Sequence, residues 1–256
     1  MLNRPSPPEV LLCDVGNSNI KLAFANAEKL FNIYTLPNKI RETEDSLGLQ
    51  LCSLLTHAEF KPQNLKACVI SSVSPALDPL LLAAVKRYLG CAVIFVPRDL
   101  EIPITNRYPR PHETGADRLV CAYAGRLYFP NCPALIVVDF GTAVTFDLVS
   151  GNSYCGGLIF PGPGIAAQAL TSKTAKLPDI NFDFNSLEPQ TCVDTETSIQ
   201  HGIFFGYHAL AEGLCKRLAA SLPSPVKIIG TGAFAFSLEK ISKIFDNIKI
   251  DNRHIV

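Results

Sequence analysis

The sequence lacks two features that would each have placed it in a distinct class of protein. No apolar run approaches the roughly 18 residues of a membrane-spanning helix, because Asp14 and Asp139 interrupt the most hydrophobic stretches. Lys plus Arg number 23 and Asp plus Glu also number 23, so no net basic charge attracts nucleic acid or an anionic membrane. The composition therefore predicts a soluble protein that binds neither nucleic acid nor membrane.

A third absence is that of any C-x-x-C pair. The nine cysteines are scattered, and Cys13, Cys68 and Cys121 lie inside apolar runs, where cysteine behaves as a small hydrophobic residue. This dispersed spacing argues against a disulfide framework and against a structural zinc site. We expect a reducing environment and hence a cytoplasmic location.

What is present is a chain that repeats itself. With 48% hydrophobic residues among 256, it can bury one large core or two small ones. Three strands are expected within residues 9–36, then a helix near 45–60, a strand at 67–73, a helix at 76–89 and a strand at 92–97. After a helix at 115–129, the second half repeats the βββαβαβ order, with strands within 134–160, helices at 164–173, 198–222 and 233–245, and strands at 226–230 and 247–250.

The repeat predicts an α/β fold of two lobes, residues 9–115 and 116–256. Each lobe should contain a mixed sheet flanked by helices. The segments DVGNSN at 14–19 and DFGTAV at 139–144 occupy the same hairpin in each half. We expect ligands to bind in a cleft between these hairpins.

The first hairpin combines an acid at a strand end with a tight polar turn. Its turn amides and the side chains of Asn17 and Ser18 could approach a phosphate, Lys21 could add charge, and Asp14 could lie near Mg²⁺. Taken alone, such a segment is more often only a turn.

The second hairpin makes the functional interpretation more specific. Asp139, Gly141, Thr142 and Thr145 repeat the spacing of acid, glycine and polar residue. A third element, residues 228–233 (IIGTGA), leads a buried strand into a glycine-rich turn, which could admit phosphate or nucleoside or could be an ordinary strand-to-helix turn.

Six segments together resemble the type III pantothenate kinases, within the superfamily of actin-like ATPases and sugar kinases. They are DVGNSNIK (14–21), SSVSP (71–75), YPRPHETGADR (108–118), DFGTAVTFD (139–147), GGLIFPGPG (156–164) and DTETSIQHG (194–202). The resemblance extends from about Val10 to Ile250 and implies a duplicated ribonuclease-H-like (actin-like ATPase) fold. It also implies an enzyme that uses ATP to phosphorylate pantothenate to 4'-phosphopantothenate, the first step of coenzyme A biosynthesis. We also expect a homodimer, formed through the apolar helical region around Phe204.

The resemblance assigns roles to individual residues. It makes Asp117 the base that accepts the proton of the substrate hydroxyl, Asp139 the ligand of a monovalent cation (K⁺ or NH₄⁺), and Mg²⁺ the companion of ATP. ATP would contact Asp14, Val15, Gly16, Asn17, Ser18, Asn19, Ile20, Lys21 and Thr142. Pantothenate would contact Tyr108, Gly115, Ala116, Asp117, Arg118 and Thr195, with Arg118 suited to a bidentate contact with a carboxylate.

Other interpretations stay open from the residues alone. Asp117 and Arg118 could be ordinary first-turn residues of a helix. Another small-molecule kinase or a phosphohydrolase of the actin fold would share the hairpins but not the segment 108–118, and a non-catalytic transcription accessory homologue could bind ligand only. Phe204, Phe205 and Tyr207 are expected in a core or a subunit interface. Ala233 stands where the family usually has a glycine, and its methyl group would be costly only at a positive φ.

Overall fold

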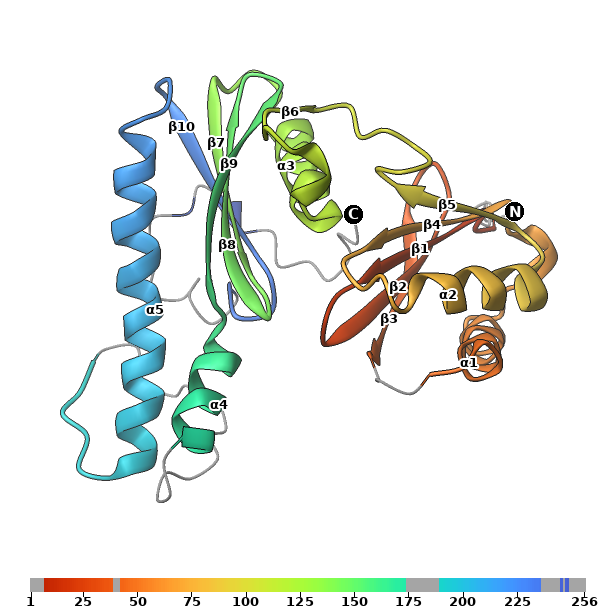
Figure 1. Cartoon of the computed structure of the whole chain (residues 1–256), viewed down its shortest axis with the longest axis horizontal. Coiled ribbons are helices and arrows are strands. Elements are labelled where there is room, and N and C mark those ends of the chain that lie inside the picture. Colours follow the sequence, from red (N-terminus) through yellow and green to blue (C-terminus); the bar gives the residue numbers. More distant parts are fainter. Residues whose placement is uncertain (1–6, 39–41, 174–188, 236–244, 246, 249–256) are drawn as a thin grey trace, which may run out of the picture. The chain divides into compact units, whose positions relative to one another are not determined.

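The structure is a computed structural model that describes residues 7–38, 42–173, 189–235, 245 and 247–248. The chain divides into two compact units (Figure 1). Unit 1 holds the chain up to Pro103 together with His112–Val120, and unit 2 holds Ile104–Pro111 and the chain from Cys121 onward. The predicted lobe boundary after residue 115 therefore falls inside the segment His112–Val120 of unit 1.

Unit 1 is built on a five-stranded sheet in the order β3-β2-β1-β4-β5. The first three strands form an antiparallel meander, and β4 and β5 run parallel to β1. The elements are β1 (Val10–Val15), β2 (Asn19–Ala25), β3 (Leu30–Pro37), α1 (Glu44–His57), β4 (Ala67–Ser72), α2 (Asp78–Ala84) and β5 (Ala92–Val96). This is the predicted βββαβαβ order. In addition, α2 continues as a short π-helix, η2 (Val85–Leu89), and a 3-10 turn, η1 (Pro62–Asn64), precedes β4.

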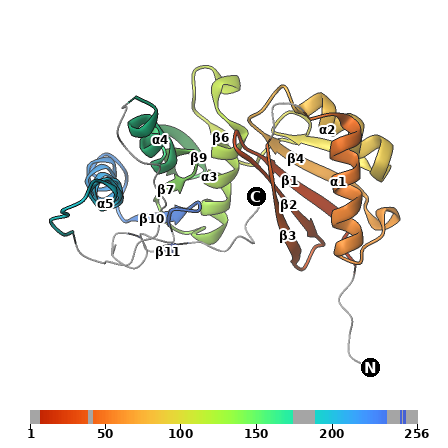
Figure 2. The ribbon, with the colours of Figure 1, turned by 90° about the horizontal axis from the view of Figure 1, so that it is seen from below.

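Both helices of unit 1 cover the same face of its sheet (Figure 2). Alternate residues of β1, namely Leu11, Cys13 and Val15, pack in one core with residues of α1 and α2. Because successive side chains of a strand point to opposite faces, Asp14 lies on the face away from this core. The alternation in the sequence thus decides where the first acid is presented.

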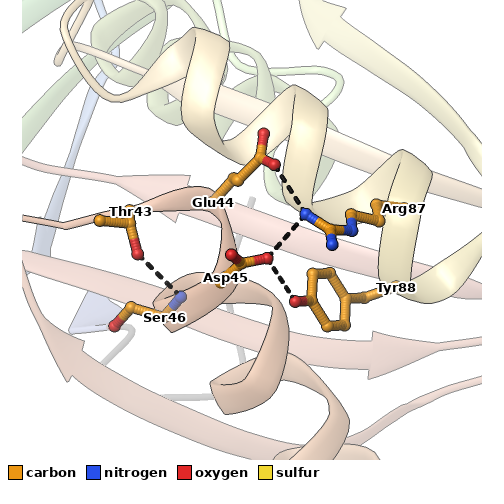
Figure 3. A network of polar contacts seen from close by, with 6 residues as sticks. All are labelled: Thr43, Glu44, Asp45, Ser46, Arg87 and Tyr88. Atoms are coloured by element: carbon orange, nitrogen blue, oxygen red, sulfur yellow. Dashed lines mark hydrogen bonds and ion pairs between the residues drawn. The ribbon is translucent and has the colours of Figure 1, made fainter.

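A polar network joins α1 to the short π-helix η2 that follows α2 (Figure 3). Arg87 Nη1 donates to Asp45 Oδ1 at 2.8 Å and to Glu44 Oε1 at 2.9 Å, and the Tyr88 hydroxyl also donates to Asp45. The Tyr88 ring lies over Gly48, where a Cβ atom would overlap it. The glycine therefore allows the close approach of these two segments.

Unit 2 is built on a six-stranded sheet in the order β11-β10-β7-β8-β9-β6. Two elements cross the boundary between the units: the 3-10 turn η3 (Pro111–Glu113), which belongs to unit 1 from His112, and α3 (Ala116–Tyr128), which belongs to unit 1 up to Val120 and to unit 2 from Cys121. The other elements of unit 2 are β6 (Thr105–Asn106), β7 (Ala134–Phe140), β8 (Ala143–Ser150), β9 (Ser153–Pro161), α4 (Pro163–Lys173), α5 (Thr195–Ala219), β10 (Val226–Thr231) and β11 (Asn247–Ile248). The helix predicted at 233–245 lies mostly outside the described residues, and the short strand β6 was not predicted.

The two sheets repeat one topology. The order β3-β2-β1-β4-β5 of unit 1 corresponds to β9-β8-β7-β10-β11 of unit 2, with the same antiparallel and parallel neighbours. The second sheet is covered on both faces, by α5 through Phe204 and Tyr207 and by α3, whose Gly125 would meet Val137 within 3.0 Å if it carried a Cβ atom. The internal duplication predicted from the sequence is therefore confirmed, and Phe204 and Tyr207 belong to the core.

Candidate active site

The first acid, Asp14, is the penultimate residue of β1 and lies between two polar neighbours. It pairs with Lys21 across the β1–β2 hairpin and with Ser71 on the parallel strand β4. Burial raises the pKa of Asp14, the positive charge of Lys21 partly lowers it, and the negative charge of Asp117 raises it further. The fold of unit 1 therefore brings two predicted site acids, Asp14 and Asp117, within electrostatic reach of each other.

The β1–β2 turn is closed by its own backbone. Gly16 N donates to Asn19 O at 2.9 Å, and a Cβ atom at Gly16 would lie 3.2 Å from that same oxygen. The side chains of Asn17, Ser18, Asn19 and Lys21 are exposed. The other two predicted ATP-contacting residues, Val15 and Ile20, have side chains buried in the core, so only their backbone is available to a ligand.

Sequence reasoning missed Asn38, which braces this turn. Its side-chain amide donates to Gly16 O at 2.7 Å and, more weakly, to Ser74 Oγ at 3.5 Å, while its backbone N–H donates to Ser18 O at 2.9 Å. Asn38 follows β3 and thus ties the turn to the loop after β4. A lone asparagine 20 residues beyond the motif carries no signal of this in the sequence.

Asp117 lies in the first turn of α3. Burial raises its pKa, while the hydrogen bond from the Arg118 backbone N–H, at 2.8 Å from Oδ1, and the Arg118 charge lower it in part. The Arg118 side chain is 7% exposed. Gly115 lies so close that a Cβ atom there would overlap Asp117 Oδ1 and sit 3.5 Å from Val73.

In unit 2, Asp139 repeats the surroundings of Asp14. It is the penultimate residue of β7 and pairs with Thr145 across the second hairpin and with Thr231 on the parallel strand β10. Gly232 follows with φ +90°, and a Cβ atom there would overlap Asp139 Oδ1 and lie 2.6 Å from Phe140 O. Ala233 has no positive φ, so the expected penalty for its methyl group does not arise.

Thr142 is exposed at the tip of the second hairpin. Gly141 N donates to Ala143 O at 3.1 Å, and Gly162 N donates to Thr142 O at 3.0 Å. A Cβ atom at Gly162 would overlap the carbonyl oxygens of both Gly141 and Thr142. The start of α4 is therefore held against this turn, a close approach that only glycine permits.

The two remaining predicted substrate residues also belong to unit 2 and lie at different elements. Tyr108 follows β6, and its backbone N–H donates to Asn106 Oδ1 at 3.0 Å. Thr195 is exposed at the start of α5, beside the N-cap Asp194, whose pKa is lowered chiefly by hydrogen bonds from Thr197. An open cavity of about 470 Å³ is lined by residues 192–195 with Ser198 and Ile199.

Among the described residues, no group of three His, Cys, Asp or Glu side chains is placed to hold a metal ion. Within those residues, every helix is too short or too polar to cross a membrane. The nine cysteines, all described, form no disulfide.

Comparison with known proteins identifies the family. The family model for type III pantothenate kinase matches residues 10–217. A type III pantothenate kinase from Desulfovibrio desulfuricans is 52% identical over 241 residues, which cover 94% of this chain and 92% of that protein. This chain belongs to the type III pantothenate kinase family.

Two solved structures share the fold of this member of the type III pantothenate kinase family. An ethanolamine utilization protein from Carboxydothermus hydrogenoformans has a TM-score of 0.54 at 14% identity, covering 98% of this chain and 86% of that one. An N-acetylglucosamine kinase from Porphyromonas gingivalis has a TM-score of 0.50 at 12% identity, covering 95% of each chain. At these identities the likeness concerns the fold alone, and it confirms the predicted fold class of actin-like ATPases and sugar kinases.

Proposed function

We propose that this chain uses ATP to phosphorylate pantothenate to 4'-phosphopantothenate, the first step of coenzyme A biosynthesis. Family membership supports the reaction. The observation that carries the proposal is the half-buried Asp117 carboxylate at the start of α3, within electrostatic reach of Asp14 at the end of the phosphate-binding hairpin. Phosphoryl transfer needs this combination of a group that orients the hydroxyl and a group that organises the phosphates.

In this proposal Asp117 accepts the proton of the substrate hydroxyl. The transferred phosphoryl group passes through a loose transition state, so the base mainly orients the attacking oxygen. Burial raises the pKa of Asp117, which makes its carboxylate a better proton acceptor than an exposed one. The Arg118 backbone hydrogen bond keeps Oδ1 in place, which leaves the other carboxylate oxygen for the substrate.

ATP is proposed to bind at the two matched hairpins. The turn after β1 offers the exposed side chains of Asn17 and Ser18 together with backbone amides, and Lys21 contributes positive charge. Asp14 would interact with the Mg²⁺ that accompanies ATP, since Mg²⁺ prefers carboxylate oxygen. Thr142, exposed at the second hairpin, would contact ATP through its hydroxyl.

Pantothenate is proposed to contact Tyr108, Gly115, Ala116, Asp117, Arg118 and Thr195. The Arg118 guanidinium suits the substrate carboxylate, because a planar donor fork can make two parallel hydrogen bonds to it. The exposed Thr195 hydroxyl at the helix start is available as a further partner. Ala116 is buried, so it would contribute backbone groups only.

A monovalent cation, K⁺ or NH₄⁺, is proposed at Asp139. The residues present fit such an ion in their donor chemistry, because the Asp139 carboxylate and the Phe140 carbonyl oxygen lie side by side against Gly232. Oxygen donors of this kind suit hard cations. When bound, the cation would offset negative charge of the ATP phosphates.

We further propose a cytoplasmic homodimer. Exposed apolar side chains at the end of β9 and on α4 support association, since Ile159 is 65% exposed and Ile165 is 43% exposed. Sedimentation analysis of the purified chain over a range of concentrations tests the dimer. A monomer at micromolar concentration would contradict it.

The reaction is tested by measuring ADP release from the purified chain with ATP, Mg²⁺ and K⁺, with and without pantothenate. We expect release to depend on pantothenate and to vanish in Asp117→Asn. Glu28→Gln, which neutralises an exposed acid at the β2–β3 turn of the same unit, is the matched control and should keep full activity. Release that responds to sugars but not to pantothenate would favour another kinase of the same fold. Equal activity in Na⁺ and K⁺ would remove the cation proposal.

A further inference from the structure

Unit 2 contains a fully buried carboxylate, Asp147, that none of the roles above uses. Its side chain is 0% exposed and accepts hydrogen bonds from Tyr154 OH at 2.9 Å and from Thr145 Oγ1 at 2.9 Å. A buried acid is costly unless it is hydrogen-bonded, and both oxygens of Asp147 accept such a bond. Asp147 therefore holds the Tyr154 hydroxyl firmly in one place.

A β-bulge lies next to this pair. Asp147 pairs with Gly157 and Val149 pairs with Tyr154, so two steps along β8 correspond to three steps along β9. The extra residue is accommodated with Gly156 at φ +92°, a backbone conformation that favours glycine. Bulges redirect the neighbouring side chains of a strand.

Tyr108 rests on the bulge. Its ring lies edge-on to the Tyr154 ring, with centroids 5.8 Å apart and an interplanar angle of 78°. A Cβ atom at Gly156 would lie 3.5 Å from Tyr108 Cε1, so the ring packs directly over this glycine. The backbone is tied to the same place, because Arg107 N donates to Tyr154 O at 3.0 Å.

We propose that Asp147 and Tyr154 are positioning residues that set the ring of Tyr108 for pantothenate. This inference rests on the proposed function, in which Tyr108 contacts the substrate. Asp147 fixes the Tyr154 hydroxyl, the Tyr154 ring packs nearly perpendicular to the Tyr108 ring, and the Tyr108 ring lies over Gly156 at the bulge. A buried carboxyl group of unit 2 thus serves the placement of one aromatic ring.

Tyr154→Phe is the selective variant for this inference. It removes the hydroxyl but keeps the ring, whereas a change at Asp147 would also release Thr145, the register partner of Asp139. We expect the KM for pantothenate to rise about three- to tenfold, because a displaced binding group loses complementarity. The KM for ATP should change much less, since the contacts described for this pair are with Thr145 and Tyr108, which are not among the residues proposed to bind ATP.

A double-mutant cycle separates positioning from a general structural effect. In a Tyr108→Ala background, Tyr154→Phe should leave the KM for pantothenate unchanged, because there is no ring left to position. Tyr207→Phe is the matched control: it removes the hydroxyl of another buried tyrosine of unit 2, which donates to Pro161 O at 2.5 Å. This control should lower the Tm and leave the KM for pantothenate as in the wild type.

The inference is overturned if Tyr154→Phe leaves the KM for pantothenate unchanged or raises it equally with and without Tyr108. If Tyr154→Phe does not fold, Gly156→Ala tests the same contact from below the Tyr108 ring and should also raise that KM selectively; an unchanged KM there overturns the inference as well. A wild-type protein without pantothenate-dependent turnover would refute the proposed function and this inference together. An active wild type with unaffected variants would refute the inference alone.

Discussion

A Cβ atom at Gly115 would overlap Oδ1 of Asp117 and lie 3.5 Å from Val73 Cγ1. Gly115 is not among the glycines with positive φ, so space and not backbone conformation demands a glycine there. Any side chain at this position must displace the carboxylate that we assign as the base. The position of the Asp117 carboxylate therefore depends on the absence of a side chain at Gly115.

From this contact we predict that Gly115→Ala lowers kcat/KM by about 100-fold, because displacement of a reacting group by about 1 Å can cost that much. The steady-state rate with saturating ATP checks it. Gly206→Ala is the matched control, since a Cβ atom there meets nothing within 4 Å and lies inside the long helix α5. That control should retain activity. Wild-type turnover in Gly115→Ala would argue that the carboxylate is not positioned by this contact.

Replacing Asp14 or Asp117 by Asn should increase the free energy of unfolding at neutral pH while removing activity. Burial raises the pKa of Asp14 and of Asp117 above the ordinary 3.8. The folded state therefore favours the protonated carboxyl groups, and the stability that they contribute is fully present below pH 3.8 and is lost as the pH rises through the raised folded-state pKa. At neutral pH each ionised carboxylate is thus a cost that Asn removes. Urea unfolding of the ligand-free protein at pH 7 measures the change.

Asp194→Asn gives the control of opposite sign for that measurement. Hydrogen bonds from Thr197 lower the pKa of Asp194, so its contribution is present above the ordinary carboxylate pKa and is lost as pH falls through the lowered value. Its removal should destabilise the protein at pH 7. If Asp14→Asn and Asp117→Asn also destabilise, the desolvation cost assigned to those two acids is wrong.

Asn38→Ala should weaken ATP binding. It removes the amide that donates to Gly16 O and Ser74 Oγ, and the loss of such hydrogen bonds costs about 0.5–1.5 kcal/mol each in stability. We expect the KM for ATP to rise about tenfold, since the loosened turn must be ordered on binding. Asn26→Ala is the control: Asn26 accepts from Glu28 N and Lys29 N at the other turn of the same meander. Equal KM values for ATP in both variants would contradict the bracing role.

Gly232→Ala should be damaging and Ala233→Gly should be nearly neutral. Gly232 has φ +90°, where a non-glycine residue costs about 1–2 kcal/mol, and its added methyl would also push on Asp139. We expect Gly232→Ala to raise the K⁺ concentration needed for half-maximal activity, measured by titration of K⁺ at constant ionic strength. A larger effect at Ala233 than at Gly232 would contradict the assignment of the critical turn position.

Gly48→Ala should destabilise unit 1 without touching the site. The added methyl would overlap the Tyr88 ring, which is held by Asp45 (Figure 3). Overpacking costs about 1–3 kcal/mol, and the better helix propensity of alanine returns only up to about 1 kcal/mol. Thermal unfolding should show a lower Tm with unchanged KM values. An unchanged Tm would mean that the ring moves aside freely.

Several levels of the structure could be predicted from the sequence because they depend on local patterns. Period-two alternation and polar turns identified the meanders of both halves, and the repeated acid-x-Gly spacing identified the matched hairpins. The strand β6 was not predicted because its two residues form a strand only through their pairing with β9, which lies far along the sequence. Asn38, Tyr154 and Asp147 escaped because nothing in their own neighbourhood indicates their partners.

The sequence by itself determined that the chain repeats a βββαβαβ unit and that Asp14 and Asp139 end matching strands, since strand alternation and turn chemistry act over a few residues. Only the tertiary structure decided that Asp117, about 100 residues from Asp14, comes within its electrostatic reach, and that burial raises both pKa values. It also decided that Gly232, not Ala233, takes the positive φ beside Asp139. Such features depend on which side chains and carbonyl groups come into contact when segments distant in the sequence pack together. A local sequence pattern does not specify these contacts.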